Sequence, residues 1–351
     1  MKLFFSPAQL AHQPQQYMVH GKLIHAFENN DRATTLLGAL ADAGLAPQEP
    51  KDHDLAPIHA VHADHFVDFL RTAYDEFQKL PNAGPEVLTN IHPHVGAAPD
   101  FGPRPKPRPT GIIGRTGHYV GDLSAVIMAG TYSSALMSAY SALDAAQALL
   151  DGDAASFALC RPPGHHAYID RAAGFCFLNN AALAAQKLRE RYRRVAILDF
   201  DTHHGDGTQA IFYRRDDVYF GSVHTDPSAY YPHYVGYADE RGAGRGEGFN
   251  RNIPLGHGAD DAAFLAANKA IIDEALAHGA EALVISAGWD AHHKDPLSKL
   301  KVTTDAYARL GEMYGALSLP TVIVQEGGYS LEAIADASRA FAKAYRARKG
   351  V

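Results

Sequence analysis

The 351-residue sequence has few cysteines, no long apolar runs and no excess of positive charge. Its two cysteines are too few for a disulfide framework. Because Cys160 and Cys176 both stand among apolar neighbours, we expect buried, unreactive thiols. No apolar stretch approaches the roughly 20 residues that a membrane helix needs, and the apolar run near the first residue is too short for a signal peptide. We therefore expect a cytoplasmic protein without a membrane partner.

Basic residues are outnumbered in this chain. The 32 lysines and arginines stand against 39 aspartates and glutamates, which gives a formal net charge of −7. General nucleic-acid binders need a basic face, so we expect no nucleic-acid partner, whereas a cationic substrate is compatible with this charge. The sequence also has no G-x-S-x-G elbow, no P-loop and no H-E-x-x-H motif, which removes three common signatures of hydrolases and nucleotide-binding proteins.

Short apolar runs alternate with helix-like segments along most of the chain. The runs cover residues 156–160, 195–199, 218–224, 282–287 and 321–325, and helix-like segments cover 179–192, 260–279 and 303–317. Continuous apolar strands that alternate with helices pair in parallel, with both faces of the sheet covered. The sequence therefore predicts an α/β fold with a central, mostly parallel β-sheet flanked by helices.

A proline-rich segment interrupts this alternation. Residues 81–110 contain eight prolines and show no strong periodicity. Loops of this length are uncommon inside compact domains and are usually functional or disordered. We interpret the chain as one domain, residues 1–351, with an insertion at about 81–125.

Four polar clusters each follow a predicted strand directly. They are RPPGHH at 161–166, DFDTHHGDG at 199–207, GWDAHHKDP at 288–296 and EGGYS at 326–330. In open parallel sheets, ligands bind outside the carboxyl ends of the strands. Four clusters in this position predict a single polar site at one edge of the sheet.

The second and third clusters hold candidate metal ligands. Asp201 and His203 have the i, i+2 spacing that puts both side chains on one side of an extended segment, and Asp290 is the candidate third ligand. An imidazole and carboxylates suit Zn²⁺ or Fe²⁺, and three protein ligands with an open position indicate a catalytic site. The alternative is that these acids cap helices and bind turn amides.

The first cluster places His165 beside His166. Adjacent histidines are awkward as joint metal ligands, and proton transfer is the better role because histidine titrates near neutrality. Asp199 and Asp206 are the candidate partners that orient the two rings. The alternative is a polar loop with two solvated imidazoles.

The fourth cluster contains Tyr329 after two glycines. Its hydroxyl is a candidate donor to a developing oxyanion, although a tyrosine after Gly-Gly also occurs in ordinary loops. Histidine pairs by themselves are not specific, and for His204, His292 and His293 we expect polar loop positions without a catalytic role.

The motifs RPPGHHA, GFCFLNNAALAA, VAILDFDTHHGDGTQAIF, SAGWDAHHKDPL and EGGY together resemble those of the histone deacetylase superfamily, in the same order. The resemblance covers roughly residues 110–345, and within the superfamily the chain is most similar to bacterial acetylpolyamine amidohydrolases. It implies an arginase-like fold and metal-dependent hydrolysis of an acetamide to acetate and an amine.

The resemblance also implies a role for each matching residue. His166 would be the general base that later protonates the amine, His165 its electrostatic partner, and Tyr231 a substrate wall where phenylalanine is usual. The resemblance further implies Zn²⁺, with Fe²⁺ as an alternative, a structural K⁺ near Ser222, and a homodimer formed through the insertion. The implied site comprises the metal ligands Asp201, His203 and Asp290, the catalytic His165, His166 and Tyr329, their orienting Asp199 and Asp206, and the substrate-binding Gly174, Phe175 and Tyr231.

The chain departs from the polyamine enzymes at the entrance to the site, where those enzymes place acidic side chains. Tyr17 stands where an acid is expected, Asp122 is the nearest acidic candidate, and RPKPR at 104–108 would oppose a highly cationic substrate. A protein acetyl-lysine deacetylase therefore stays open as an alternative. Two further rivals are an arginase-type hydrolase with two manganese ions, for which clustered ligands are too few, and a catalytically silent protein that binds acylated amines.

Overall fold

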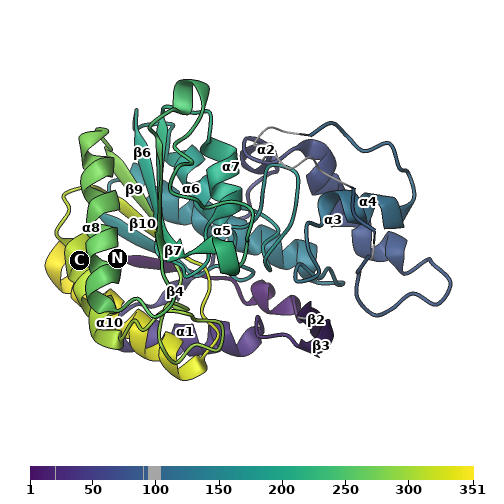
Figure 1. Ribbon diagram of the computed structural model, residues 1–351, viewed down its shortest axis with the longest axis horizontal. Helices are drawn as coiled ribbons and strands as arrows, with labels where there is room; N and C mark the ends of the chain where they lie inside the picture. The colour runs from purple at the N-terminus through teal and green to yellow at the C-terminus, as the bar shows by residue number, and fades with distance from the viewer. Residues whose placement is uncertain (20, 90, 94–103) are drawn as a thin grey trace.

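The computed structural model describes residues 1–19, 21–89, 91–93 and 104–351 and centres on an eight-stranded sheet (Figure 1). The strand order is β4–β1–β5–β10–β9–β6–β7–β8, and every neighbouring pair is parallel. The predicted α/β fold with a parallel sheet is thereby confirmed. The strands are β1 (Lys2–Phe4), β4 (Pro47–Gln48), β5 (Ala155–Ala158), β6 (Val195–Asp199), β7 (Val218–Thr225), β8 (Asn250–Leu255), β9 (Ala282–Ala287) and β10 (Thr321–Gln325).

The strands that the sequence does not predict lie toward the two edges of the sheet. β1 and β4 have three and two residues, too few to form a recognisable apolar run. β8 reads NRNIPL and includes Pro254, which cannot donate to a ladder and is tolerated at an edge. A separate antiparallel hairpin joins β2 (Gln16–Val19) to β3 (Lys22–His25).

Helices cover both faces of the sheet because successive strand residues point to opposite sides. On β6, Ile197 packs into the core shared with α5 and α6, whereas Leu198 packs into the core shared with α8 and α10. The first face carries α5 (Thr131–Leu150), α6 (Asn180–Leu188) and α7 (Asp206–Phe212). Outside this layer, α2 (Ala56–His59) packs against α6, α3 (Asp64–Phe77) against α5, and α4 (Ile112–Tyr119) against α3 (Figure 1). The second carries α1 (Asn30–Asp42), α8 (Asp261–Ala277), α9 (Thr304–Gly315) and α10 (Leu331–Lys349). Among the described residues there are also three short 3-10 turns: η1 (Pro7–Ala11), η2 (Pro227–Ala229) and η3 (Gly244–Gly246).

The predicted insertion contains a helix. α4 packs against α3, where the ring centroids of Tyr119 and Phe69 lie 4.7 Å apart. In the proline-rich stretch before α4, the guanidinium of Arg104 lies 3.1 Å from the carboxylate of Asp170, so this positive charge is paired. Residues 94–103 of the predicted insertion lie outside the described residues.

The two cysteines are buried, as their apolar neighbours predict. Cys160 and Cys176 are free and buried, and burial raises the pKa of both thiols. Both therefore stay protonated and unreactive at neutral pH. Across the described part of the chain, every helix is too short or too polar to cross a membrane.

Candidate active site

The four polar clusters meet at one edge of the sheet. β5, β10, β9 and β6 are consecutive neighbours, so the loops that follow them lie side by side. The parallel topology thus assembles one site from four distant stretches of sequence, at the carboxyl ends of the strands.

Asp201, His203 and Asp290, here called the ligand triad, each offer one ligand atom within 4.8 Å of the others. The Nδ1 atom of His203 lies 3.1 Å from Asp201 Oδ1 and 3.2 Å from Asp290 Oδ2. Backbone amides fix both carboxylates: Gly327 N donates to Asp201 Oδ2 at 2.8 Å, and Thr202 N donates to Asp290 Oδ1 at 3.0 Å. Among the described residues this is the one cluster of three such ligands, so no second metal site of the arginase type is found there.

The ligand triad suits a divalent cation. Asp290 Oδ2 is buried and accepts no hydrogen bond, while burial and the nearby Asp201 carboxylate raise the pKa of Asp290 to about 7. A Cβ atom on Gly288 would lie 2.0 Å from Asp201 Oδ2, so glycine at this position leaves room for the carboxylate. Two crowded carboxylates and one imidazole are a ligand set that Zn²⁺ accepts, and a cation between them would offset their repulsion.

His165 and His166 are buried and have different carboxylate partners. The Nδ1 atom of His165 lies 3.0 Å from Asp199 Oδ2, and that of His166 lies 2.6 Å from Asp206 Oδ1. For His165, burial opposes the charged form, but neighbouring carboxylates led by Asp199 outweigh it and raise the pKa well above its usual value. For His166, burial and the charge of His165 outweigh Asp206 and lower the pKa to about 4. One ring is therefore arranged as an imidazolium and the other as a neutral imidazole.

Tyr329 lies in the loop between β10 and α10 and is half-buried. The Asp295 carboxylate fixes its backbone, because Oδ2 accepts from Tyr329 N at 2.6 Å and from Ser330 N at 2.9 Å. The phenol ring stands edge-on to Phe175, 5.7 Å between centroids, and the Arg32 guanidinium lies 4.9 Å from its centre. Burial raises the pKa of Tyr329, so its hydroxyl keeps the proton and remains a hydrogen-bond donor.

The residues predicted to flank a substrate lie beside the catalytic candidates. Tyr231 stands edge-on to His166, with ring centroids 5.0 Å apart, and its hydroxyl donates to Asp122 at 2.7 Å. Gly174 has φ +52°, and a Cβ atom there would lie 2.3 Å from the His166 ring. Glycine at this position therefore allows the turn that carries Phe175 to approach the histidine pair.

The remaining predicted positions make structural contacts. Tyr17, in the position where an acid is expected, packs its buried ring 5.2 Å from that of Phe175. The Ser222 hydroxyl bonds to His224 Nδ1 at 2.8 Å, and the His204 ring packs 4.6 Å from that of His224. Tyr17 thus adds an apolar ring, not a charge, to the flank of the site.

Sequence reasoning misses the role of Glu326, a buried carboxylate behind the histidine pair. Its Oε2 atom accepts from Gly164 N at 2.7 Å and from His165 N at 3.1 Å, and its Oε1 atom accepts from Ser286 Oγ at 3.1 Å. Glu326 thereby links the loop after β10 to the loop after β5. Glu326 is the first residue of the EGGYS cluster, and this position is the feature of the sequence that could have predicted its role.

A second missed feature is an ion network between α1 and the site loops. Arg32 donates to Gly328 O at 2.5 Å and to Glu326 O at 2.7 Å, and it pairs with Glu28 at 2.9 Å. The same Glu28 carboxylate pairs with Arg161 at 2.8 Å, and all three charged side chains are almost fully buried. The sequence of α1 carries no signal for this network, because the network depends on where the helix docks.

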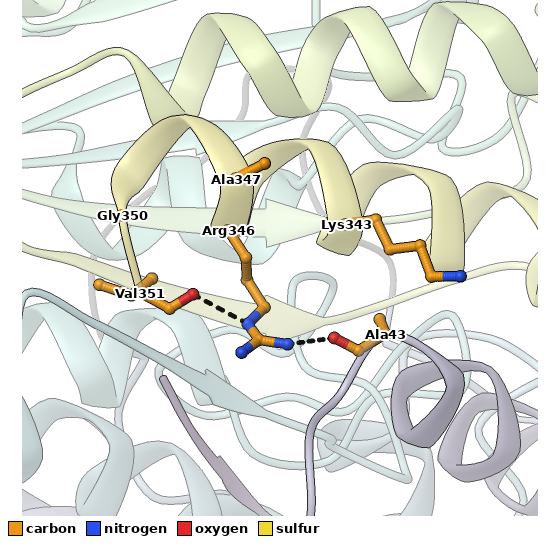
Figure 2. Close-up of a pocket in the computed structure, with 6 residues that line it drawn as sticks. All are labelled: Ala43, Lys343, Arg346, Ala347, Gly350 and Val351. Atoms are coloured by element: carbon orange, nitrogen blue, oxygen red, sulfur yellow. Dashed lines mark hydrogen bonds between the residues drawn. The ribbon is translucent and has the colours of Figure 1, made fainter.

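The pocket drawn in Figure 2 lies at the carboxyl end of α10, whereas Tyr329 lies just before the start of that helix. Arg346 donates there to Ala43 O and Val351 O, so it joins the ends of α1 and α10. This hollow is formed by helix-end packing and is separate from the polar site. Its lining consists of Ala43, Lys343, Arg346, Ala347, Gly350 and Val351.

Comparison with known proteins agrees with this geometry. The chain matches the family model described as the histone deacetylase domain over residues 25–345. An acetylpolyamine amidohydrolase of Burkholderia pseudomallei (strain 1710b) is 44% identical over 351 residues, which are 100% of each chain. Acetylpolyamine amidohydrolase 1 of Pseudomonas aeruginosa is 42% identical over 332 residues, 94% of each chain. A crystal structure of acetylpolyamine aminohydrolase from Burkholderia pseudomallei superimposes with a TM-score of 0.93 at 43% identity, covering 99% of each chain.

Proposed function

The chain belongs to the histone deacetylase family, and from this premise we propose that it removes acetyl groups from N-acetylated amines, chiefly acetylated polyamines and diamines. The observation that carries the proposal is the ligand triad beside Tyr329 and two buried histidines, each held by its own carboxylate. Full-length similarity to proteins named acetylpolyamine amidohydrolases supports the small-molecule substrate class. Tyr17, uncharged where an acid is expected, favours acetyl-lysine in proteins as the second candidate substrate.

In the proposed reaction, Zn²⁺ held by the ligand triad, or Fe²⁺ in its place, would polarise the acetyl carbonyl and acidify a water molecule. His166, which is neutral because of burial, takes the proton of this water as its oxygen attacks the acetyl carbon. The Tyr329 hydroxyl donates to the carbonyl oxygen as it gains negative charge, and cationic His165 stabilises the same charge. The C–N bond then breaks, His166 returns the proton to the leaving amine, and acetate is released.

We further propose that residues 1–351 act as one domain and form a homodimer through the insertion at about 81–125. Ile91 in the insertion has 59% of its surface exposed, and Met18 and Leu23, which are cross-strand partners in the β2–β3 hairpin, are exposed too. A partner subunit would cover these apolar side chains. We also propose a K⁺ ion beside Ser222. Ser222 on β7 is the register partner of Asp199 on β6, which supports this position.

Acetate release by the Zn²⁺-loaded chain tests the function. We expect the highest kcat/KM on acetylated diamines and polyamines, loss of turnover after chelation, and recovery when Zn²⁺ is returned. His203→Ala should lose both metal and activity. Preference for acetyl-lysine peptides would select the second candidate, binding without turnover would indicate a silent binding protein, and two metal ions per chain would indicate the arginase-type alternative.

A further inference from the structure

Asp122 lies where the two segments that flank the site meet. Its Oδ2 atom accepts a hydrogen bond from the Tyr231 hydroxyl at 2.7 Å and another from Gly174 N at 3.0 Å. Gly174 directly precedes Phe175, so a single carboxylate oxygen joins the segments that carry the two aromatic rings. Phenylalanine at position 231 would have no hydroxyl with which to make this bond.

The position of Asp122 is itself fixed by its neighbours. Its Oδ1 atom accepts from Ser124 N at 2.8 Å and from Ser124 Oγ at 2.5 Å. One residue earlier, Gly121 N donates to Ala172 O at 2.7 Å, which ties this segment to the strand-like start of the Phe175 turn. A carboxylate held at both oxygens acts as a rigid support.

The turn that presents Phe175 needs such support. Gly174 has φ +52° and Phe175 has φ +67°, and the second value is unfavourable for a residue with a side chain. The turn is closed by Cys176 N donating to Ala173 O at 2.8 Å. A strained backbone of this kind persists only where its surroundings hold it, and the Asp122–Gly174 bond is one such contact.

Each of the two flanking rings touches one group of the proposed reaction. Tyr231 lies against His166 with ring centroids 5.0 Å apart, and Phe175 lies against Tyr329 at 5.7 Å. A substrate that contacts both His166 and Tyr329 would therefore lie against both rings. Their separation depends on the oxygen that both segments share.

We propose that Asp122 is a positioning residue that determines specificity: it braces Tyr231 and the Phe175 turn at a fixed separation and so selects amides of unbranched amines. The inference rests on the proposed deacetylation. An unbranched methylene chain passes closely spaced rings, whereas a substituent on the carbon next to the amide nitrogen requires the rings to move apart.

The test compares the Zn²⁺-loaded wild type with Tyr231→Phe, Asp122→Ala and the double variant. The two substrates are a linear acetylated monoamine and its isomer with a methyl branch next to the nitrogen. We expect Tyr231→Phe to lose about tenfold in the linear-to-branched ratio of kcat/KM, mainly through KM, because it removes the bond to the Asp122 carboxylate. Asp122→Ala removes that bond and the bond from Gly174 N as well, so it should lose at least as much. The double variant should lose no more than Asp122→Ala alone. Tyr237→Phe, which removes a hydroxyl bonded to His233 O at 2.8 Å in the same loop, should match the wild type.

Several outcomes would overturn the brace while leaving deacetylation intact. One such outcome is a Tyr231→Phe variant whose linear-to-branched ratio of kcat/KM equals that of the wild type. Another is a double variant whose loss in this ratio equals the sum of the losses in the two single variants. A third is an Asp122→Asn variant that loses activity only on cationic diamines and keeps its linear-to-branched ratio, which would give Asp122 a direct charge role instead. An inactive wild type would refute the proposed function itself.

Discussion

At the scale of single residues, the two histidines of the site differ because their surroundings supply different amounts of negative charge. Their ring centroids lie 4.0 Å apart, so two imidazolium ions would repel each other. His165 Nε2 also lies 3.9 Å from Asp201, whereas His166 must share Asp206 with the Tyr168 hydroxyl, which donates to it at 2.9 Å. These surroundings raise the pKa of His165 and lower that of His166, so His166 is the ring favoured to accept a proton.

Replacement of Tyr329 by phenylalanine tests the oxyanion role. The ring contacts with Phe175 and Arg32 survive this change, so folding and metal content should be unaffected. We expect kcat to fall by about 10²–10³, which is the usual cost of losing one such donor, with KM little changed. Steady-state kinetics and metal analysis of the purified variant give the answer. Near-normal turnover would remove Tyr329 from the mechanism.

At the scale of structural elements, Glu326 connects the loop after β10 to the loop that carries the histidine pair. Glu326→Ala would leave the buried Gly164 and His165 amides without their acceptor, and the loop would shift. Because small displacements of catalytic groups cost up to about 10²-fold, we expect a loss of that size in kcat at nearly constant KM. Glu326→Gln keeps one acceptor oxygen and should recover most of the rate. Equal losses in both variants would contradict a positioning role.

The network between α1 and the site loops makes a prediction about stability. Glu28→Gln would leave Arg32 and Arg161 buried without their counter-charge. Breaking a buried ion pair in this way costs about 3–5 kcal/mol, so the urea midpoint should fall markedly.

A surface pair provides the control for this stability measurement. Asp216 pairs with Arg245, whose side chain is 82% exposed, and Asp216→Asn should cost less than about 1 kcal/mol. Similar unfolding free energies for Glu28→Gln and Asp216→Asn would show that the buried network adds no more stability than a surface pair.

The sequence predicts those site residues that lie in the loops after the central strands. Asp201, His165 and Asp290 each lie in a loop that follows an apolar strand, and the parallel-sheet rule places such loops at one edge. Asp122 and Arg32 follow no central strand; each reaches the site through the docking of a segment on the sheet, which local pattern does not encode. The strands β1 and β4 are unpredicted for a different reason, because three and two residues are too few to form a recognisable apolar run.

At the scale of the whole molecule, several histidines are buried in the neutral form. Burial is the main cause that lowers the pKa of His12, His62, His166 and His224 to about 4. In the unfolded chain a histidine takes up its proton near pH 6.5. Below that pH the unfolded state binds more protons than the folded state, so the free energy of unfolding falls as the solution is acidified.

His62 allows this effect to be measured away from the ligand triad. Its Nδ1 atom donates to Tyr168 O at 2.9 Å and its Nε2 atom accepts from Asn179 N at 2.9 Å, so a second proton would break the latter bond. The low pKa of His62 adds to the free energy of unfolding, and this addition is fully present above pH 6.5. It decreases as the pH falls toward 4 and is constant below that value. Between these two pH values the free energy of unfolding should fall by about 3 kcal/mol because of His62.

His62→Asn should therefore be less stable than the wild type at pH 7.5 but lose less stability on acidification, so that the two curves converge toward pH 4. Urea unfolding at a series of pH values, with both proteins at the same metal loading, measures this difference. His25→Asn, at an exposed position on β3, should follow the wild-type curve. Parallel curves for His62→Asn and the wild type would mean that His62 takes up its proton equally well in the folded and unfolded chains, and that its two hydrogen bonds do not hold the neutral form.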